Sequence, residues 1–380
     1  MFLNVQFLEA VGLIFGMIIG SGIFVLPYAV SVSGIVWGLI TAFLAFLGIL
    51  GVHLAYGEIV LNSDGLHRLP GYAKKYLGKF FGVFATLSQI LGFNTVLLIF
   101  GGLGGIFLNI LFGGNPFIWS LAFFGVASLL LLFENIEGIG FIDFILTMPL
   151  IAIIIFISFL SYNGGSFQNI NLFGTDRFFS FGVFVFALAG LAAIADARDI
   201  FRKKDAADSG RLLKLAIIYG TAVSFVLYLM FSLGVIMASD GQVTKNAMSG
   251  LSGILGQNIV KIGALLGLLS IFRSYLALGY NLNAMYKLDL RLLPAIAWVA
   301  SLSIPIVLFL AGAKDFLKLI SIMGGTFVAF DGIMVVYILR RMRNIGLAKN
   351  RLLSFGKIQQ YFLIAVFSLG IIYELIYQIF

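Results

Sequence analysis

The first apolar segment of the chain, from Phe7 to Val30, is interrupted where a membrane-spanning helix should be continuous. It reads GMIIGSGIFVLP from Gly16 to Pro27. Glycine and proline leave backbone N–H and C=O groups without intrahelical partners. In hydrocarbon such groups survive only where protein buries them or where they line a cavity. The segment therefore favours a binding site at a helix break. A simple kink is the alternative, because both residues are common in membrane helices.

The composition identifies the surroundings of this segment as a membrane. Hydrophobic residues make up 61% and charged residues 11% of the 380 residues, and the mean hydropathy is +1.10. These values exclude a soluble domain and predict an all-α polytopic membrane protein in contact with lipid. At about 20 residues per span, about eleven transmembrane helices fit. The chain has no cysteine and two histidines, so we expect neither an enzyme nor a cofactor or metal site. A channel would need a continuous polar lining, and the spans offer only scattered Ser, Asn and Thr.

The basic residues alternate between the two sides of the predicted bundle. Most of the 24 Lys and Arg residues cluster in loops near 68–79, 198–214, 287–291 and 340–357, which all fall on one side. The opposite side carries Arg177, Lys245, Lys261, Lys314 and Lys318. Because cytoplasmic loops are enriched in Lys and Arg, the N-terminus is predicted in the cytoplasm and the C-terminus outside, in a multi-pass plasma membrane protein. The net charge of +8 then needs no nucleic acid partner.

A second loosened span appears near the middle of the chain. The sixth predicted span, about 177–200, consists almost wholly of small residues from Phe186 to Ala193, around Gly190. Close helix packing through small residues is one interpretation. Interruptions at corresponding places in two halves, however, indicate the midplane site of an inverted-repeat transporter. The sequence thus predicts one five-helix repeat over 1–161, a second over 177–340, and an additional C-terminal helix in 355–380.

Four motifs resemble those of amino acid permeases. They are GSGIFVLPYA at 20–29, AYGEIV at 55–60, FALAG at 186–190 and SYLALG at 274–279. In these motifs and in its span pattern the chain is similar to the amino acid–polyamine–organocation superfamily, including its amino acid/auxin and aromatic amino acid permease branches. The resemblance implies the LeuT-type fold, with two inverted five-helix repeats, alternating access, and a substrate held at the breaks of the first and sixth spans.

The resemblance also implies a set of substrate-binding residues at the two breaks. They are Met17, Gly20, Ser21, Gly22, Phe184, Phe186, Ala187 and Gly190. Ser21 and Gly22 would receive the carboxylate, since the N-terminus of a half-helix favours an anion, and the Met17 carbonyl would accept from the amine. Phe186, or Phe184 in another register, would form an aromatic lid. No acidic residue is predicted at either break, so a neutral, apolar or aromatic amino acid is the expected substrate.

Arg273 lies where sodium-coupled relatives bind an ion. By resemblance the ion site would combine carbonyls of Phe15 and Ile18 with the eighth-span residues Ser270, Arg273 and Ser274. An arginine in place of a hydroxyl ligand suggests that its fixed charge replaces sodium. The alternative is a structural pair with Asp331 or Asp196.

The presence of Arg273 limits which ion can drive transport and which residue can carry it. Arginine does not lose its proton in proteins, so a proton-coupled cycle needs a carboxylate, for which Asp331 is best placed. The proton is thus the candidate coupling ion of a transporter. An amino acid exchanger and a non-transporting sensor of the same fold remain alternatives.

Overall fold

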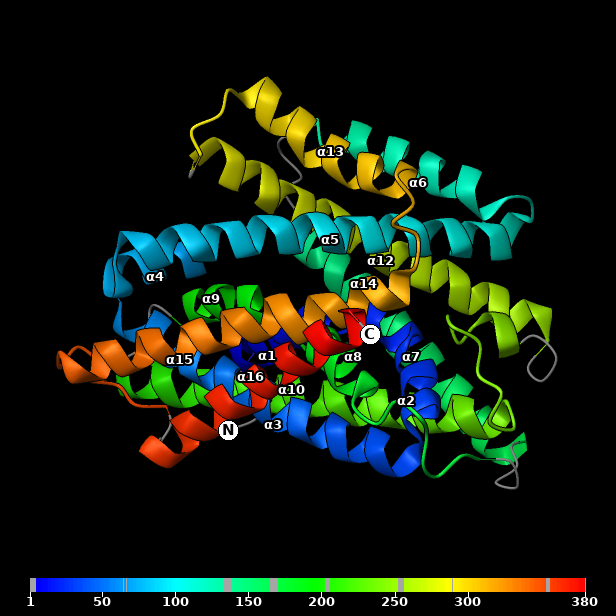
Figure 1. Cartoon of the computed structure of the whole chain (residues 1–380), viewed down its shortest axis with the longest axis horizontal. Helices are drawn as coiled ribbons and strands as arrows, with labels where there is room; N and C mark the ends of the chain where they lie inside the picture. The colour runs from blue at the N-terminus through cyan, green and yellow to red at the C-terminus, as the bar shows by residue number, and fades with distance from the viewer. Residues whose placement is uncertain are drawn as a thin grey trace.

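The protein is a bundle of helices that run mostly along its long axis (Figure 1). The computed structural model describes residues 5–63, 65, 67–132, 139–164, 170–201, 206–251, 256–288, 290–352 and 356–379. Over these residues the regular elements are all helical, as an apolar chain in a membrane requires, because a helix satisfies its backbone groups internally.

The first half of the chain contains a broken first helix, as the spacing of its glycines and proline predicts. The elements are α1 (Val5–Ile18), η1 (Ser21–Phe24), α2 (Leu26–Ser33), α3 (Ile35–Asn62), α4 (Leu69–Leu77), α5 (Lys79–Phe112), α6 (Pro116–Leu130) and α7 (Ile139–Gly164). The regular α-helix stops at Ile18, a single 3₁₀ turn follows, and Pro27 occupies the first turn of α2. A proline is tolerated there because the first-turn N–H groups have no intrahelical partner.

The second half repeats this interruption in its first helix and adds a π-helical turn. The elements are α8 (Phe179–Ala187), α9 (Leu191–Ile200), α10 (Ala206–Ala238), η2 (Ser249–Leu251), α12 (Gln257–Leu288), α13 (Pro294–Leu310), α14 (Phe316–Ile322), η3 (Met323–Val328), α15 (Ala329–Asn344) and α16 (Lys357–Ile379). The segment η3 is a π-helix within the continuous stretch from α14 to α15. Such turns are frequent at functional sites, and the sequence analysis does not anticipate this one.

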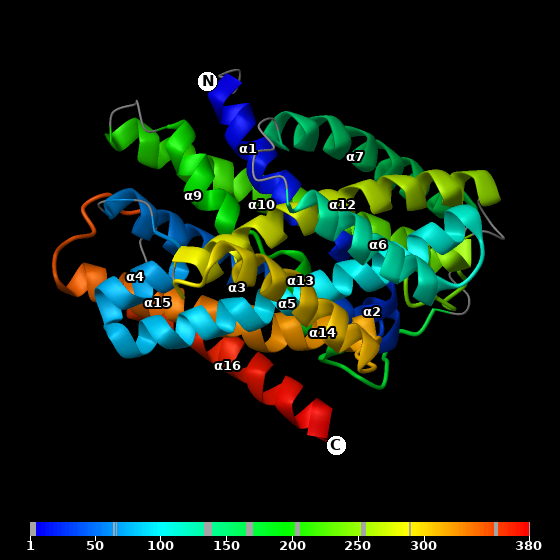
Figure 2. The same cartoon turned by 90° about the horizontal axis from the view of Figure 1, so that it is seen from above.

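The lengths of the helices fit an integral, multi-pass membrane protein. Among the described residues, seven helices are long and apolar enough to cross a bilayer by length and composition, from Ile35–Asn62 to Lys357–Tyr377. Four shorter apolar helices accompany them: Val5–Ile18, Pro116–Leu130, Ile151–Leu160 and Pro294–Leu310. The helix α16 lies at the periphery of the bundle, beside α14 and α15 (Figure 2), and it packs directly on α15 and η3.

Many of the basic loops gather at one end of the bundle, which we call the α4 end. There Arg343 of α15 donates two hydrogen bonds of 2.7 Å to the carboxylate of Glu58 in α3, and Glu58 also accepts from the backbone N–H of Leu352. Asn62 and Asn350 exchange reciprocal hydrogen bonds of 2.8 and 2.9 Å. These contacts fasten the segment that precedes α16 to the end of α3.

The broken helices occupy the interior of the bundle. Phe24 of η1 is buried and lies edge-on to Phe107 of α5 and Phe231 of α10. A Cβ at Gly267 of α12 would lie 2.8 Å from the rings of Phe24 and Phe107, so a glycine is required for this close approach. The break in the first helix is therefore held by α5, α10 and α12 together.

Candidate substrate site at two helix breaks

The breaks of the first and sixth predicted spans touch each other inside the bundle. A Cβ at Gly22 would lie 2.6 Å from the Cβ of Ala187, closer than real carbon atoms approach. A Cβ at Gly190 would lie 2.9 Å from the Ile18 side chain and 3.5 Å from the His53 ring. Only residues without a Cβ permit these contacts, which explains the glycines that the sequence places at both breaks.

A tyrosine of α10 bridges the two breaks. The hydroxyl of Tyr228 lies 2.5 Å from the carbonyl oxygen of Ile18 and 3.1 Å from that of Ala187. These carbonyls belong to the last residues of α1 and α8, where no further turn of helix supplies an N–H donor. Tyr228 is fully buried, so its hydroxyl offers hydrogen bonding where neither water nor the helix does. The sequence analysis does not identify this residue.

The predicted substrate-binding residues differ in how far they are covered. Met17 is 41% exposed, whereas Ser21 is 2% exposed, and Gly22 and Gly190 are also buried. Phe184 is fully buried and faces Phe225 of α10, with 6.4 Å between ring centroids. Phe186, like Gly20, is only partly buried. The structure therefore keeps Phe184 in the core and leaves Phe186 as the more accessible of the two aromatic residues.

Arg273 reaches from α12 to the first helix. Its Nη2 donates a 3.0 Å hydrogen bond to the carbonyl oxygen of Gly16. The two carbonyls assigned to an ion by resemblance have other donors: Phe15 accepts from the N–H of Ile19 at 2.8 Å, and Ile18 accepts from Tyr228. The flanking residues in α12 are Ser270, which is buried, and Ser274, which is partly buried. A guanidinium thus lies beside the first helix, at the carbonyl of Gly16 and not at those of Phe15 and Ile18.

Asp331 lies at a different helix contact, between α15 and α5. It accepts a 3.1 Å hydrogen bond from Ser88 of α5. It follows the π-helical turn η3 by three residues, and Thr326 within that turn donates to the carbonyl of Ile322. The structure thus brings Arg273 to the first helix and Asp331 to the interface of α5 with α15.

His53 of α3 is a buried titratable group beside the second break, where a Cβ at Gly190 would lie 3.5 Å from its ring. Its Nδ1 lies 3.1 Å from the Thr221 hydroxyl of α10. Its Nε2 has no hydrogen-bond partner among the described residues. His53 therefore lies in the core of the bundle. Because the neighbours of His53 in the sequence are mostly apolar, the sequence alone does not show that its polar ring lies in the core.

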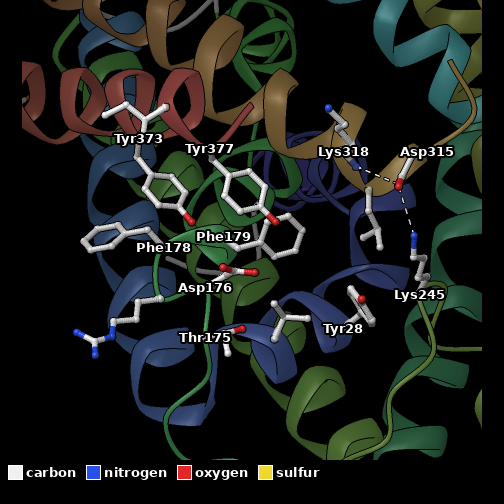
Figure 3. A pocket seen from close by; sticks show the side chains of 14 residues that line it. Tyr28, Thr175, Asp176, Phe178, Phe179, Lys245, Asp315, Lys318, Tyr373 and Tyr377 are labelled. Atoms are coloured by element: carbon white, nitrogen blue, oxygen red, sulfur yellow. Dashed lines mark hydrogen bonds and ion pairs between the residues drawn. The ribbon is translucent and has the colours of Figure 1, made fainter. Parts of the chain in front are cut away.

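A pocket of about 940 Å³ opens at the opposite end of the bundle from α4, and we call this the pocket end. Figure 3 shows Tyr373 and Tyr377 of α16 on one wall, Asp176 between them and Tyr28, and a charged group of Lys245, Asp315 and Lys318 on the other wall. Lys245 and Asp315 form an ion pair of 3.3 Å. The pocket therefore combines aromatic rings with both signs of charge.

Solved structures of membrane transporters share this architecture. The chain aligns with MhsT in complex with L-phenylalanine at a TM-score of 0.70 and 14% identity, over 97% of each chain. It aligns with Mhp1, a nucleobase-cation-symport-1 family transporter with bromovinylhydantoin bound, at 0.65 and 15%, over 97% of this chain and 90% of the other. A manganese transporter from Eremococcus coleocola gives 0.63 and 15%, over 97% and 85%.

These likenesses establish the LeuT-type fold that the motifs imply. At such low identities they show the fold alone and leave the substrate open. The sequence matches no protein family profile, and no curated protein matches it.

Proposed function

We propose that the protein is a secondary active transporter of neutral, apolar or aromatic L-amino acids that works by alternating access. The observation that carries this proposal is the meeting of two interrupted helices at Gly22 and Ala187. Half-helix N-termini attract a carboxylate, and freed carbonyls attract an ammonium group. An amino acid zwitterion carries both groups. The breaks of α1–η1–α2 and α8–α9 contain no acidic side chain, and the acidic residues of α9 follow only at Asp196 and Asp199, which disfavours a cationic substrate.

We further propose that transport is independent of sodium. Arg273 donates a hydrogen bond to the Gly16 carbonyl and brings a permanent positive charge beside it. The Tyr228 hydroxyl lies within hydrogen-bond distance of the Ile18 and Ala187 carbonyls. A bound cation would compete with these donors for the same oxygens. The Arg273 guanidinium thus supplies a fixed positive charge, and the neutral Tyr228 hydroxyl supplies a hydrogen-bond donor, at oxygens that a sodium ion would otherwise have to coordinate.

Proton coupling is the proposed driving force. Arg273 cannot exchange its proton, and Asp331, bonded to Ser88, is the carboxylate that the sequence assigns to this role. A carboxyl group inside a transmembrane bundle is costly and marks proton relays in transporters.

We also propose a layout for the chain in the membrane. The two five-helix repeats would comprise 1–161 and 177–340, followed by the additional helix in 355–380. The α4 end, which carries most of the basic loops, would face the cytoplasm of a cell whose plasma membrane holds the protein. The pocket end would then face outward. Cysteine labelling tests this orientation, because the native chain has no cysteine and a single one can be introduced in either set of loops.

The proposal is tested by transport into proteoliposomes. The purified chain is reconstituted, and uptake of pooled radiolabelled neutral amino acids is measured under an inward proton gradient, an inward sodium gradient, or preloading with unlabelled amino acids. We expect accumulation with the proton gradient alone. Stimulation by preloading alone would identify an exchanger, and saturable binding without flux would identify a sensor. Uptake that requires sodium would contradict the assigned role of Arg273 and leave the fold unchanged.

A further inference from the structure

The peripheral helix α16 carries a buried carboxyl group. Glu374 is 1% exposed, and its Oε2 accepts a 2.7 Å hydrogen bond from the hydroxyl of Ser321, which is fully buried at the end of α14. Acidic residues are rarely buried within a membrane bundle unless they serve a function. The five-plus-five pattern gives α16 no part in transport, so the presence of this carboxyl requires an explanation.

The carboxyl sits where three helices approach most closely. A Cβ at Gly325 of η3 would lie 3.1 Å from both the Cβ and the Oε2 of Glu374. A Cβ at Gly324 would lie 1.8 Å from the carbonyl oxygen of Gly182 in α8, and one at Gly370 would lie 2.5 Å from the Phe181 ring. The π-helical turn η3 is therefore clamped between α8 and α16. Because α8 ends at the candidate substrate site, a movement of η3 against Gly182 would also displace Ala187, which lies less than two helical turns further along α8.

A pocket lies beside the turn of α16 that carries this carboxyl group. Tyr373 and Tyr377, on the turn that carries Glu374, form one wall of the pocket (Figure 3), and their rings stack at 5.8 Å. Asp176 also lines the pocket, on the side that faces the two tyrosines (Figure 3). Solvent in the pocket therefore reaches Tyr373, the residue next to Glu374 in α16.

The charged and titratable groups around Glu374 come from few elements. Tyr373 and Tyr377 belong to its own helix, Asp176 precedes α8, and Tyr28 of α2 faces Tyr377. The helices α8 and η3 contain no ionisable residue, and α14 contributes only Lys318, which lines the pocket. From α3, His53 is bonded to Thr221 and Glu58 to Arg343. From α15, Asp331 is bonded to Ser88, Arg340 lies over the Tyr361 ring of α16, and Arg341 and Arg343 lie in the last turn.

We propose that Glu374 is a proton-binding site of the transport cycle, loaded from the pocket. This inference rests on the proposed function and adds a second proton site to it. A hydronium ion in the pocket gives up the proton and becomes water, and the proton forms the O–H bond of a carboxylic acid on Glu374. Closing the clamp around an ionised carboxylate costs free energy that closing it around the acid does not. Proton binding and closure of α8 and α16 on η3 are therefore linked, and each favours the other.

The coupling test compares variants in proteoliposomes under an inward gradient of two pH units. One proton per substrate can then drive accumulation of about 100-fold. Because Asp331 still couples one proton, we expect E374Q to lower the accumulation ratio by up to about 100-fold while it keeps counterflow exchange at the wild-type rate. The control D208N removes an exposed carboxylate of α10 and should accumulate as wild type does. Wild-type accumulation by E374Q, whether or not D331N loses it, would overturn the proposal.

A second readout does not depend on transport. Infrared difference spectra of the purified wild type between acidic and neutral pH should contain a carboxylic acid band that is absent in E374Q and shifted in S321A. Presence of the band in a wild type that moves no substrate would refute the transport function and keep the proton site. An identical band in E374Q would refute the site. Should E374Q fail to fold, S321A decides: its pH profile of uptake should shift, and an unchanged spectrum and profile would overturn the proposal.

Discussion

Gly22 and Ala187 lie in direct van der Waals contact, although 3₁₀ and α-helical segments from two halves of the chain present them. This contact makes the two helix breaks a single structural unit. A side chain added at either position must push the half-helices apart.

Gly22→Ala is therefore expected to abolish uptake. The new methyl group would lie 2.6 Å from the Ala187 Cβ, and overpacking of this kind forces backbone shifts. The matched control is Gly12→Ala in α1, where a Cβ would meet nothing within 4 Å. Because alanine is the better helix former, this control should keep uptake and unfold no earlier than wild type. Equal uptake by both variants would show that the contact between the breaks is dispensable.

Tyr228→Phe should weaken both the fold and transport. The variant keeps the ring and leaves the carbonyls of Ile18 and Ala187 without their phenolic donor. Loss of a donor to buried acceptors costs about 1–3 kcal/mol, which thermal unfolding in detergent would report as a lower midpoint. Tyr337→Phe, at a tyrosine 44% exposed, is the control and should leave the midpoint unchanged. A Tyr228→Phe protein as stable as this control would argue against the bridge.

Arg273→Thr tests whether the guanidinium stands in for a cation. The substitution leaves three small hydroxyl side chains at 270, 273 and 274 in α12 and frees the Gly16 carbonyl. We expect sodium-independent uptake to fall and the remaining uptake to rise when sodium is added, as measured by initial rates in sodium and in choline media. Arg273→Lys keeps the positive charge, so its initial rate of uptake should be the same in sodium and in choline media. A threonine variant indifferent to sodium would remove the support for replacement.

Arg343→Ala should destabilise the bundle strongly. The variant leaves the fully buried carboxyl group of Glu58 without its bidentate partner, and breaking a buried ion pair from one side costs about 3–5 kcal/mol. The more exposed pair of Arg198 and Asp199 gives the control. Arg198→Ala should cost below about 1 kcal/mol, because solvent screens such pairs. Similar unfolding midpoints for the two variants would mean that the Glu58 pair contributes little.

The fold was predictable from residues that break a helix in hydrocarbon. Gly16, Gly20 and Pro27 mark the first interruption by composition alone, and the small residues around Gly190 mark the second. The π-helical turn η3 was not predictable, because such a turn depends on how α14 and α15 pack against α8 and has no residue pattern of its own. The sequence contains Gly324 and Gly325, but it does not show that their lack of a side chain allows Gly182 and Glu374 to approach closely.

The candidate site was predictable only in part. Arg273 attracts notice because a charged side chain inside an apolar span is rare. Tyr228 does not, since tyrosine is common here, with 14 in the chain, and only three-dimensional contact places its hydroxyl on two carbonyls. Glu374 offered the same signal as Arg273, a charge within an apolar helix. Glu374 lies outside the five-plus-five repeat pattern, which assigns no role to α16.

The fastening of Glu58 to Arg343 also constrains how the chain is made. The two residues are 285 positions apart, and Asn62 and Asn350, beside them, are 288 apart. During synthesis from the N-terminus, α3 is therefore complete long before its partners exist. Its carboxylate must stay in contact with water at the edge of the bilayer until α15 is inserted. The bonds of Glu58 with Arg343 and of Asn62 with Asn350 then hold α3 to α15 and to the segment before α16. A chain that ends before residue 343 lacks both contacts at the α4 end.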